Sequence, residues 1–308
     1  MRLKDHIRLR YFLAGVSLIT PLFTGCIRED RSACATETDL YIKVQPAEFY
    51  GGSSAPVEEA TVYLFDHNKR FISQIGVSRQ QIESNIPVRI SVSPSDNPWA
   101  VVWGNIKENE QVSGLGPSAQ MDEVLVMLKK DSEGYDIAPD NLFYGIKKLS
   151  GSGTEEVTIS LKVGRVELTV KGLPQDARAE DYYFTVDAAY GGYDFEGSPL
   201  AHATEMKIQG VFNANHDLTT QQPFNMVHYP TGDTNRGGET AGAVINLWKV
   251  NGGNPELLAS AIEDSSGRPI KPEAGKKTNV LIYFRDDGSM EVSVVITGWD
   301  EIYQWNEW

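Results

Sequence analysis

Apolar and polar residues alternate with a period of two along most of the chain beyond residue 39. The stretch "VRISVS" at 88–93 alternates Val and Ile with Arg and Ser, and the same pattern runs through 155–163, 164–173 and 290–298. Successive side chains of a strand point to opposite faces, so this pattern predicts half-buried antiparallel strands.

Further runs rich in β-branched and aromatic residues bring the total to about fourteen expected strands, too many for one sandwich. These runs are 39–44, 61–66, 99–105, 141–146, 182–190, 203–212, 222–229, 242–250 and 278–284. Asp287-Gly288 predicts a hairpin between the last two strands. Evidence for helices is thin: residues 117–130 could hold a short helix, but 122–130 could equally be a strand. We therefore expect an all-β fold of two tandem β-sandwich domains, 39–163 and 164–308.

The first 25 residues have the pattern of a removable secretory signal peptide. Four basic residues precede an apolar run of 13 residues at 11–23. A helix of that length spans only about 20 Å, which is short of the hydrocarbon core of a membrane. A basic start, a short apolar centre and small residues at the end are typical of an exported protein.

Cys26 directly follows Thr24-Gly25 at the end of this segment. The arrangement resembles bacterial lipoprotein signals, in which cleavage precedes a cysteine whose sulfur is acylated, although Phe23 stands where leucine is commoner. The resemblance implies a covalent lipid such as palmitate at Cys26, where several acyl chains would form a stable anchor. The alternative is ordinary signal cleavage, with Cys26 as a buried or disulfide-bonded thiol.

Residues 26–38 are polar and without periodicity, so they are expected to form a tether between the lipid and the first strand. The acidic "IRED" within them resembles the stretch that follows the lipid cysteine in surface-exported lipoproteins of the Bacteroidetes. With only two cysteines in the chain, Cys34 would have no intrachain partner once Cys26 carries lipid. We assign Cys34 no role.

Composition and motifs argue against several functional classes. The net charge is −14, and the first 25 residues hold four basic and one acidic residue, so the remainder is more acidic still. Such a surface disfavours nucleic-acid binding. The five histidines are scattered without metal-ligand spacing, and neither a nucleophile elbow nor a phosphate loop occurs. We expect no enzymatic activity, no metal and no cofactor apart from the covalent lipid.

Aromatic residues concentrate at the C-terminal end, "GWDEIYQWNEW". Three interpretations remain open from the residues alone. The segment could close the core of its own domain, since Trp299, Tyr303 and Trp305 share the parity of one strand face. It could form an aromatic platform for sugars, or it could be a strand donated to a neighbouring sheet. The donor candidates are Trp299, Ile302, Tyr303, Trp305 and Trp308.

Several motifs together resemble the anchor-type minor fimbrillins of Bacteroidales, the FimB-like lipoproteins of type V pili. The motifs are "TGC" at 24–26, a second cysteine eight residues later, "VYLFD" at 62–66, "LFYG" at 142–145, "LKVGRVELTVKGLP" at 161–174 and "ITGWDEIYQW" at 296–305. The resemblance spans nearly the whole chain. It implies two transthyretin-like, Greek-key β-sandwiches and outer-membrane anchoring through Cys26.

The resemblance also implies a non-enzymatic role at the base of a cell-surface fimbrium, with the outer membrane and fimbrial stalk subunits as partners. The first strand, "DLYIKV" at 39–44, would stay in place because it leads to the lipid. The region around 299–308 would be donated to the last stalk subunit. The alternative is a glycan-binding surface lipoprotein of a nutrient-uptake system, which would also be two β-domains on a lipid tether.

Overall fold

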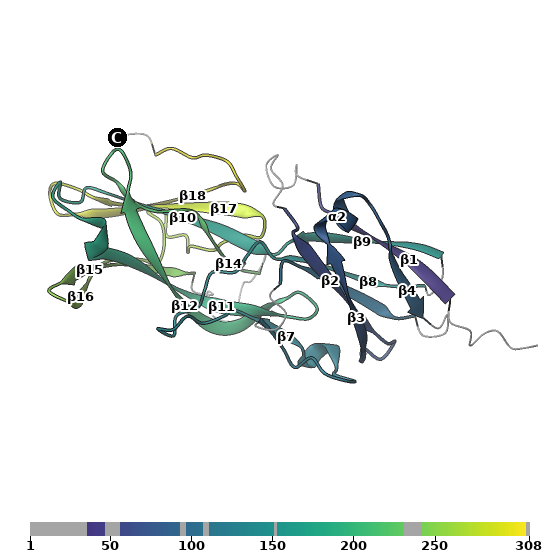
Figure 1. Cartoon of the computed structure of the whole chain (residues 1–308). Helices are drawn as coiled ribbons and strands as arrows, with labels where there is room; N and C mark the ends of the chain where they lie inside the picture. Colours follow the sequence, from purple (N-terminus) through teal and green to yellow (C-terminus); the bar gives the residue numbers. More distant parts are fainter. Residues whose placement is uncertain are drawn as a thin grey trace, which may run out of the picture. The chain divides into compact units, whose positions relative to one another are not determined.

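The computed structural model describes residues 36–46, 56–92, 97–106, 111–150, 153–230 and 242–305. The signal segment, Cys26, Cys34 and Trp308 lie outside these ranges. Strands make up 57% of the residues and helices 5%; the strands are arranged in two sheets, and the all-β sandwich prediction is confirmed (Figure 1).

The elements in chain order are β1 (Thr36–Val44), β2 (Glu59–Phe65), β3 (Phe71–Ser78), α2 (Arg79–Glu83), β4 (Val88–Val92), β5 (Trp99–Gly104), β6 (Val112–Ser113), the 3₁₀ helix η4 (Met121–Glu123), β7 (Leu125–Met127), β8 (Phe143–Lys148), β9 (Gly153–Leu161), β10 (Val163–Lys171), the 3₁₀ helix η5 (Ala179–Asp181), β11 (Tyr182–Asp194), β12 (Pro199–Phe212), β13 (Leu218–Thr220), β14 (Phe224–Val227), β15 (Val244–Asn251), β16 (Asn254–Ala261), β17 (Lys276–Phe284) and β18 (Met290–Gly298).

The first sheet has the strand order β3-β2-β5-β8-β9-β1-β4. Strand β9 pairs in parallel with β1 along residues 153–159, and its last two residues pair with β8 instead. It therefore passes from one layer to the other. Strand β1 lies between β9 and β4, so the first described strand is fully integrated into the sheet.

The second sheet has the order β16-β15-β11-β12-β13-β10-β17-β18, and β14 adds to β10. Strand β12 connects the layers, because it pairs with β11 up to Gln209 and with β13 from Gly210 onward. Strands β6 and β7 pair with each other, and β7 also pairs with β11. The boundary predicted at 163/164 stays a prediction, although only Lys162 separates β9 from β10.

The hairpin between β11 and β12 contacts the first sheet through aromatic side chains, among them Phe195 and Tyr193, whose ring lies 5.6 Å from that of Trp103. Phe195, near its tip, is fully buried and packs edge-on against Tyr63 and Phe65, with ring centroids 4.9 and 5.7 Å apart. Gly197 follows with φ +83°, and a Cβ there would lie 2.4 Å from the ring of Tyr144. Because both a left-handed backbone and close approach are required, glycine fits this position.

Beside this contact, His228 and Tyr193 hold the connection between β9 and β10. The hydroxyl of Tyr193 donates to the backbone oxygen of Lys162 at 2.5 Å, and Nδ1–H of His228 donates to the same oxygen at 2.6 Å. Burial, reinforced by the nearby Lys162 cation, lowers the pKa of His228 from 6.5 to about 4. The imidazole is therefore neutral at physiological pH.

This shift predicts that the protein loses stability in mild acid. Between pH 6.5 and about 4 the unfolded chain binds a proton at His228 that the folded chain does not, so the free energy of unfolding falls as the pH falls. The contribution is at most about 3 kcal/mol. A His228→Asn variant retains a side-chain N–H donor but cannot titrate. In urea unfolding at pH 7 and pH 4, the native protein should lose more stability than this variant; parallel pH profiles would contradict the assignment.

Candidate functional site

Strand β18 forms one edge of the second sheet. It pairs along its whole length with β17, from Phe284 opposite Met290 to Lys276 opposite Gly298. Within the described residues, a single backbone hydrogen bond reaches its other edge, from Ser265 N to the oxygen of Val292 at 3.1 Å. A mostly unpaired edge of this kind can accept or adjoin another strand.

The side chains of β18 are apolar but only partly covered. Met290 and Ile296 are exposed, the latter to 47%, and Val292 and Val294 are half-buried. On the adjoining β17, by contrast, Val280 is buried. Strand β18 therefore has a row of apolar side chains that is partly exposed to solvent. The alternation in its sequence predicts that this row packs against a core.

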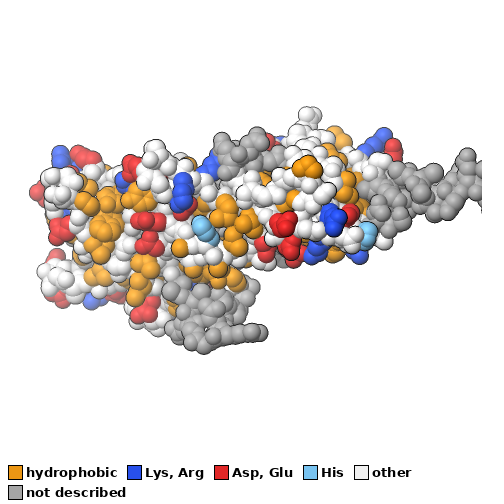
Figure 2. Space-filling model, turned by 90° about the horizontal axis from the view of Figure 1, so that it is seen from below, with side chains coloured by type: hydrophobic (Ala, Val, Ile, Leu, Met, Phe, Trp, Pro, Cys, Tyr) orange, Lys and Arg blue, Asp and Glu red, His pale blue; other side chains and the backbone are white. Residues whose placement is uncertain are grey.

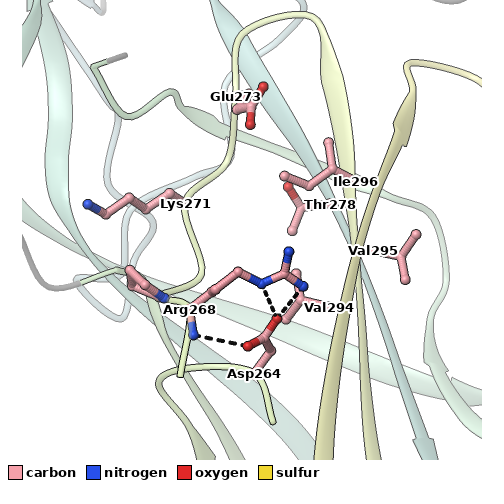
Figure 3. Close-up of a pocket in the computed structure, with 9 residues that line it drawn as sticks. Asp264, Arg268, Lys271, Glu273, Thr278, Val294, Val295 and Ile296 are labelled. Carbon is pink, nitrogen blue, oxygen red and sulfur yellow. Dashed lines mark hydrogen bonds and ion pairs between the residues drawn. The ribbon is translucent and has the colours of Figure 1, made fainter. Parts of the chain in front are cut away.

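A cavity of about 490 Å³ lies along the second half of β18 (Figure 3). Residues 294–296 and Thr278 form one side, and the segment after β16 forms the other. On that segment Arg268 closes back on Asp264, with Nη2 and Oδ2 2.6 Å apart. The ion pair fixes the loop that faces the free edge of β18.

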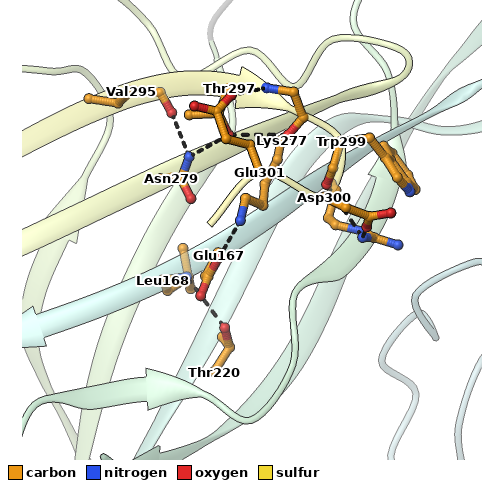
Figure 4. A network of polar contacts seen from close by, with 12 residues as sticks. Glu167, Leu168, Thr220, Lys277, Asn279, Val295, Thr297, Trp299, Asp300 and Glu301 are labelled. Carbon is orange, nitrogen blue, oxygen red and sulfur yellow. Dashed lines mark hydrogen bonds and ion pairs between the residues drawn. The ribbon is translucent and has the colours of Figure 1, made fainter. Parts of the chain in front are cut away.

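Trp299, immediately after β18, is held in the core of its own sheet. Its side chain is 1% exposed, and the guanidinium carbon of Arg165 lies 4.0 Å from its ring centroid. Arg165 also pairs with Asp300 at 2.5 Å (Figure 4). We call Arg165, Trp299 and Asp300 the C-terminal latch.

A tight turn ends β18 at the latch. The backbone N–H of Glu301 donates to the oxygen of Gly298 at 3.2 Å, and the Glu301 carboxylate accepts from the N–H of Gly298 at 3.1 Å. These reciprocal bonds reverse the chain direction. The described residues after Gly298 form no further strand.

Polar contacts brace the strands beneath the latch (Figure 4). The amide of buried Asn279 on β17 donates to the oxygen of Val295 and to the hydroxyl of Thr297, each at 3.1 Å. Buried Lys277 pairs with Glu167 on β10 at 3.0 Å. The end of β18 is therefore tied through β17 to β10.

The segment beyond the latch protrudes. Ile302 is 84% exposed and Tyr303 36% exposed, and the ring of Tyr303 meets that of Trp305 edge-on, with centroids 4.9 Å apart. The five aromatic and aliphatic residues singled out in the sequence therefore do not act as one group. Trp299 is buried, Ile302, Tyr303 and Trp305 lie beyond the turn, and Trp308 lies outside the described residues. Sequence patterns gave no indication of Arg165 or Asp300.

Two further findings concern membranes and metals. Among the described helices, none is long and apolar enough to cross a membrane. In the same ranges, no three His, Cys, Asp or Glu side chains gather closely enough to hold a metal ion.

Comparison with known families decides the relationship. The model of the Mfa2 family, described as fimbrillin-A associated anchor proteins Mfa1 and Mfa2, matches residues 31–305. The chain belongs to this family. The resemblance noted in the sequence is confirmed, and the family is one of fimbrial anchor proteins.

Individual relatives agree with this assignment. The major fimbrium anchoring subunit FimB of Porphyromonas gingivalis ATCC 33277 is 24% identical over 314 residues, covering 95% of this chain and 96% of FimB. A second FimB sequence from that species is 25% identical over 310 residues, or 94% of each protein. The solved structure of the fimbrial anchor protein Mfa2 from P. gingivalis superposes with a TM-score of 0.58 at 15% identity, over 85% of this chain and 98% of Mfa2. The last likeness shows a shared fold.

Proposed function

We propose that this Mfa2-family protein tethers a fimbrium to the outer membrane. In this proposal the signal segment is removed, lipid is attached at Cys26, and residues 26–38 tether the folded part to the surface of the cell. The C-terminal segment then joins the adjacent stalk subunit by β-strand complementation. The observation that carries the proposal is the exposed segment that follows the buried Trp299 of the C-terminal latch.

The position of β1 supports attachment through the N-terminal end. This strand is hydrogen-bonded on both sides, to β9 and to β4, and its Leu40 and Ile42 are buried. A pull on the tether would therefore act on a central strand. We infer that β1 stays in its sheet, as an anchoring subunit requires.

The latch sets where a donated segment would begin. Trp299 and Asp300 are engaged with Arg165, so the part free to pair with another subunit starts at Ile302. Strand addition provides backbone hydrogen bonds, and alternate side chains enter pockets of the partner. Tyr303 and Trp305 have the spacing to share one face of such a strand. We propose that these two rings are the main contacts with the stalk subunit.

The lipid attachment is tested by replacing Cys26 with alanine. In cells fed radiolabelled palmitate, the Cys26→Ala protein should lose the label and leave the membrane fraction, since the proposal places the anchoring acyl chains on this residue. Cys34→Ala is the matched control, and it should keep both label and membrane association. Continued labelling of the Cys26→Ala protein would overturn the anchoring proposal.

A further inference from the structure

The outward face of β12, β11 and β15 carries an ordered set of side chains that the fimbrial role does not require. Residues in register across antiparallel strands project from the same face. Three such rows follow from the pairing: Gln209, Tyr183 and Trp248; then Lys207, Thr185 and Asn246; then Glu205, Asp187 and Val244. The intervening Phe184 and Val186 are buried, so these rows face away from the core.

The first row is an aromatic surface. The rings of Tyr183 and Trp248 are nearly parallel, at 11°, with centroids 6.2 Å apart. Trp248 is partly exposed, and its Nε1–H donates to the Thr185 hydroxyl at 3.0 Å. Leu257, opposite Trp248 on β16, extends the apolar surface with 49% exposure. The hydrogen bond fixes the indole in one orientation.

The second and third rows supply fixed polar groups beside the rings. The amide of Asn246 donates to Thr185 at 3.3 Å and to Oδ2 of Asp187 at 3.1 Å. Burial raises the pKa of Asp187, and the bond from Asn246 opposes that rise. Within the described residues, neither Oδ1 of Asp187 nor the Glu205 carboxylate has a hydrogen-bond or ion-pair partner. Both can therefore accept hydrogen bonds from a ligand.

A cavity of about 540 Å³ adjoins the third row. Small residues, including Ala188, Ala203 and Gly242, leave the space, and Asp187 and Glu205 line it. In Figure 2, which views the molecule from below Figure 1, orange hydrophobic and red acidic side chains lie close together over the part that holds β11, β12 and β16. Pockets of this volume accommodate small organic ligands.

An apolar ring face next to fixed hydroxyl, amide and carboxylate groups is the combination that suits a carbohydrate. One face of a sugar ring presents C–H groups that pack on an aromatic ring, and its hydroxyls donate to carboxylates. The charge of the site selects among carbohydrates. Two cations are also present, but each is already paired: Lys130, which lines the cavity, with Asp136, and Lys207, over the Tyr183 ring, with Glu133. Asp187 and Glu205 would therefore repel sialic acids, uronic acids and sulfated sugars, as would a chain of net charge −14.

We propose that this face binds a neutral glycan, with a sugar ring against Trp248 and its hydroxyls on Asn246, Asp187 and Glu205. The site is independent of fimbrial anchoring and would add recognition of a carbohydrate to that role. It differs from the aromatic C-terminal segment, which lies beyond β18 on another part of the second sheet.

Calorimetric titration of the purified full chain tests the site. The probes are lactose, maltotriose, mannotriose and chitotriose, with 3′-sialyllactose as the charged counterpart of lactose. We expect at least one neutral saccharide to bind, and 3′-sialyllactose to bind more weakly than lactose if lactose is that ligand. Trp248→Ala should weaken binding by about tenfold or more. Asp187→Asn, which keeps the shape of the side chain, should weaken it to a measurable extent.

Trp305→Ala is the matched control, because it removes a partly exposed aromatic residue from a different surface. It should leave saccharide binding unchanged. Near-ultraviolet circular dichroism shows whether each variant is folded. If the Trp248→Ala protein does not fold, the binding measured with the Asp187→Asn protein decides the outcome. The absence of binding to all four neutral probes at concentrations up to about 10 mM, where even millimolar affinity would be detected, would overturn the proposal. So would unchanged binding by folded Trp248→Ala or Asp187→Asn protein.

Discussion

Replacing Trp299 by alanine is expected to lower the free energy of unfolding by about 3–5 kcal/mol. The substitution empties the space of a large side chain that is 1% exposed. It also removes the ring over which the Arg165 guanidinium lies at 4.0 Å, leaving a partly buried cation without that contact. The ring fills the core at the end of β18. Its removal should therefore also weaken the packing of the neighbouring strands β17 and β10.

The change is measured by chemical denaturation and by the melting temperature, which should fall by roughly 10 °C. Ile302→Ala is the matched control: its side chain is 84% exposed, so its effect should stay within about 0.5 kcal/mol. Asp300→Asn separates the ion pair from the ring contact and should cost no more than about 1 kcal/mol, since Asp300 is exposed. Equal stability of the Trp299→Ala and Ile302→Ala proteins would show that Trp299 does not belong to the core.

The strand content was predictable because alternation is a local property. The patterns at 88–93, 155–163 and 290–298 correspond to β4, β9 and β18. The hairpin between β17 and β18 is confirmed, but its connection is longer than an Asp-Gly pair suggests. Arg285 N–H donates to the oxygen of Ser289 at 2.9 Å, and Gly288 takes φ +80° within a five-residue loop.

The division of the C-terminal residues was not predictable from spacing. Shared parity puts Trp299, Tyr303 and Trp305 on one face only if the strand continues, and the Gly298–Glu301 turn ends it. Arg165, which contacts Trp299 and Asp300 within the turn, lies 134 positions before Trp299 in the chain. No local pattern connects residues so far apart, so burial of Trp299 depends on the tertiary pairing of β10 with β17.

The contact between the sheets was hidden for a similar reason. Phe195 lies in the turn-like sequence "YDFEGS", where a single aromatic residue gives no periodic signal. Its burial against Tyr63 and Phe65 depends on how β11 and β12 are placed. The short helix α2 did have a local signal. Ser78 and Gln81 form a capping box, the Ser-x-x-Gln pattern that precedes many helices.

The second large effect is expected from truncation of the chain after Glu301. This change removes Ile302, Tyr303 and Trp305 but keeps Arg165, Trp299 and the turn. Exposed side chains contribute little to the stability of the free subunit, so the truncated protein should fold as the full chain does. Aromatic anchors dominate the affinity of protein interfaces, and the loss of two of them together with the paired backbone should weaken binding by at least about 100-fold.

Co-purification of the fimbrial stalk protein with the full and truncated chains is the most direct measurement of how the subunit is joined to its fimbrium. The account predicts that the chain ending at Glu301 melts at the same temperature as the full chain but no longer retains the stalk protein. Retention of the stalk protein at an unchanged level by the folded, truncated chain would contradict it.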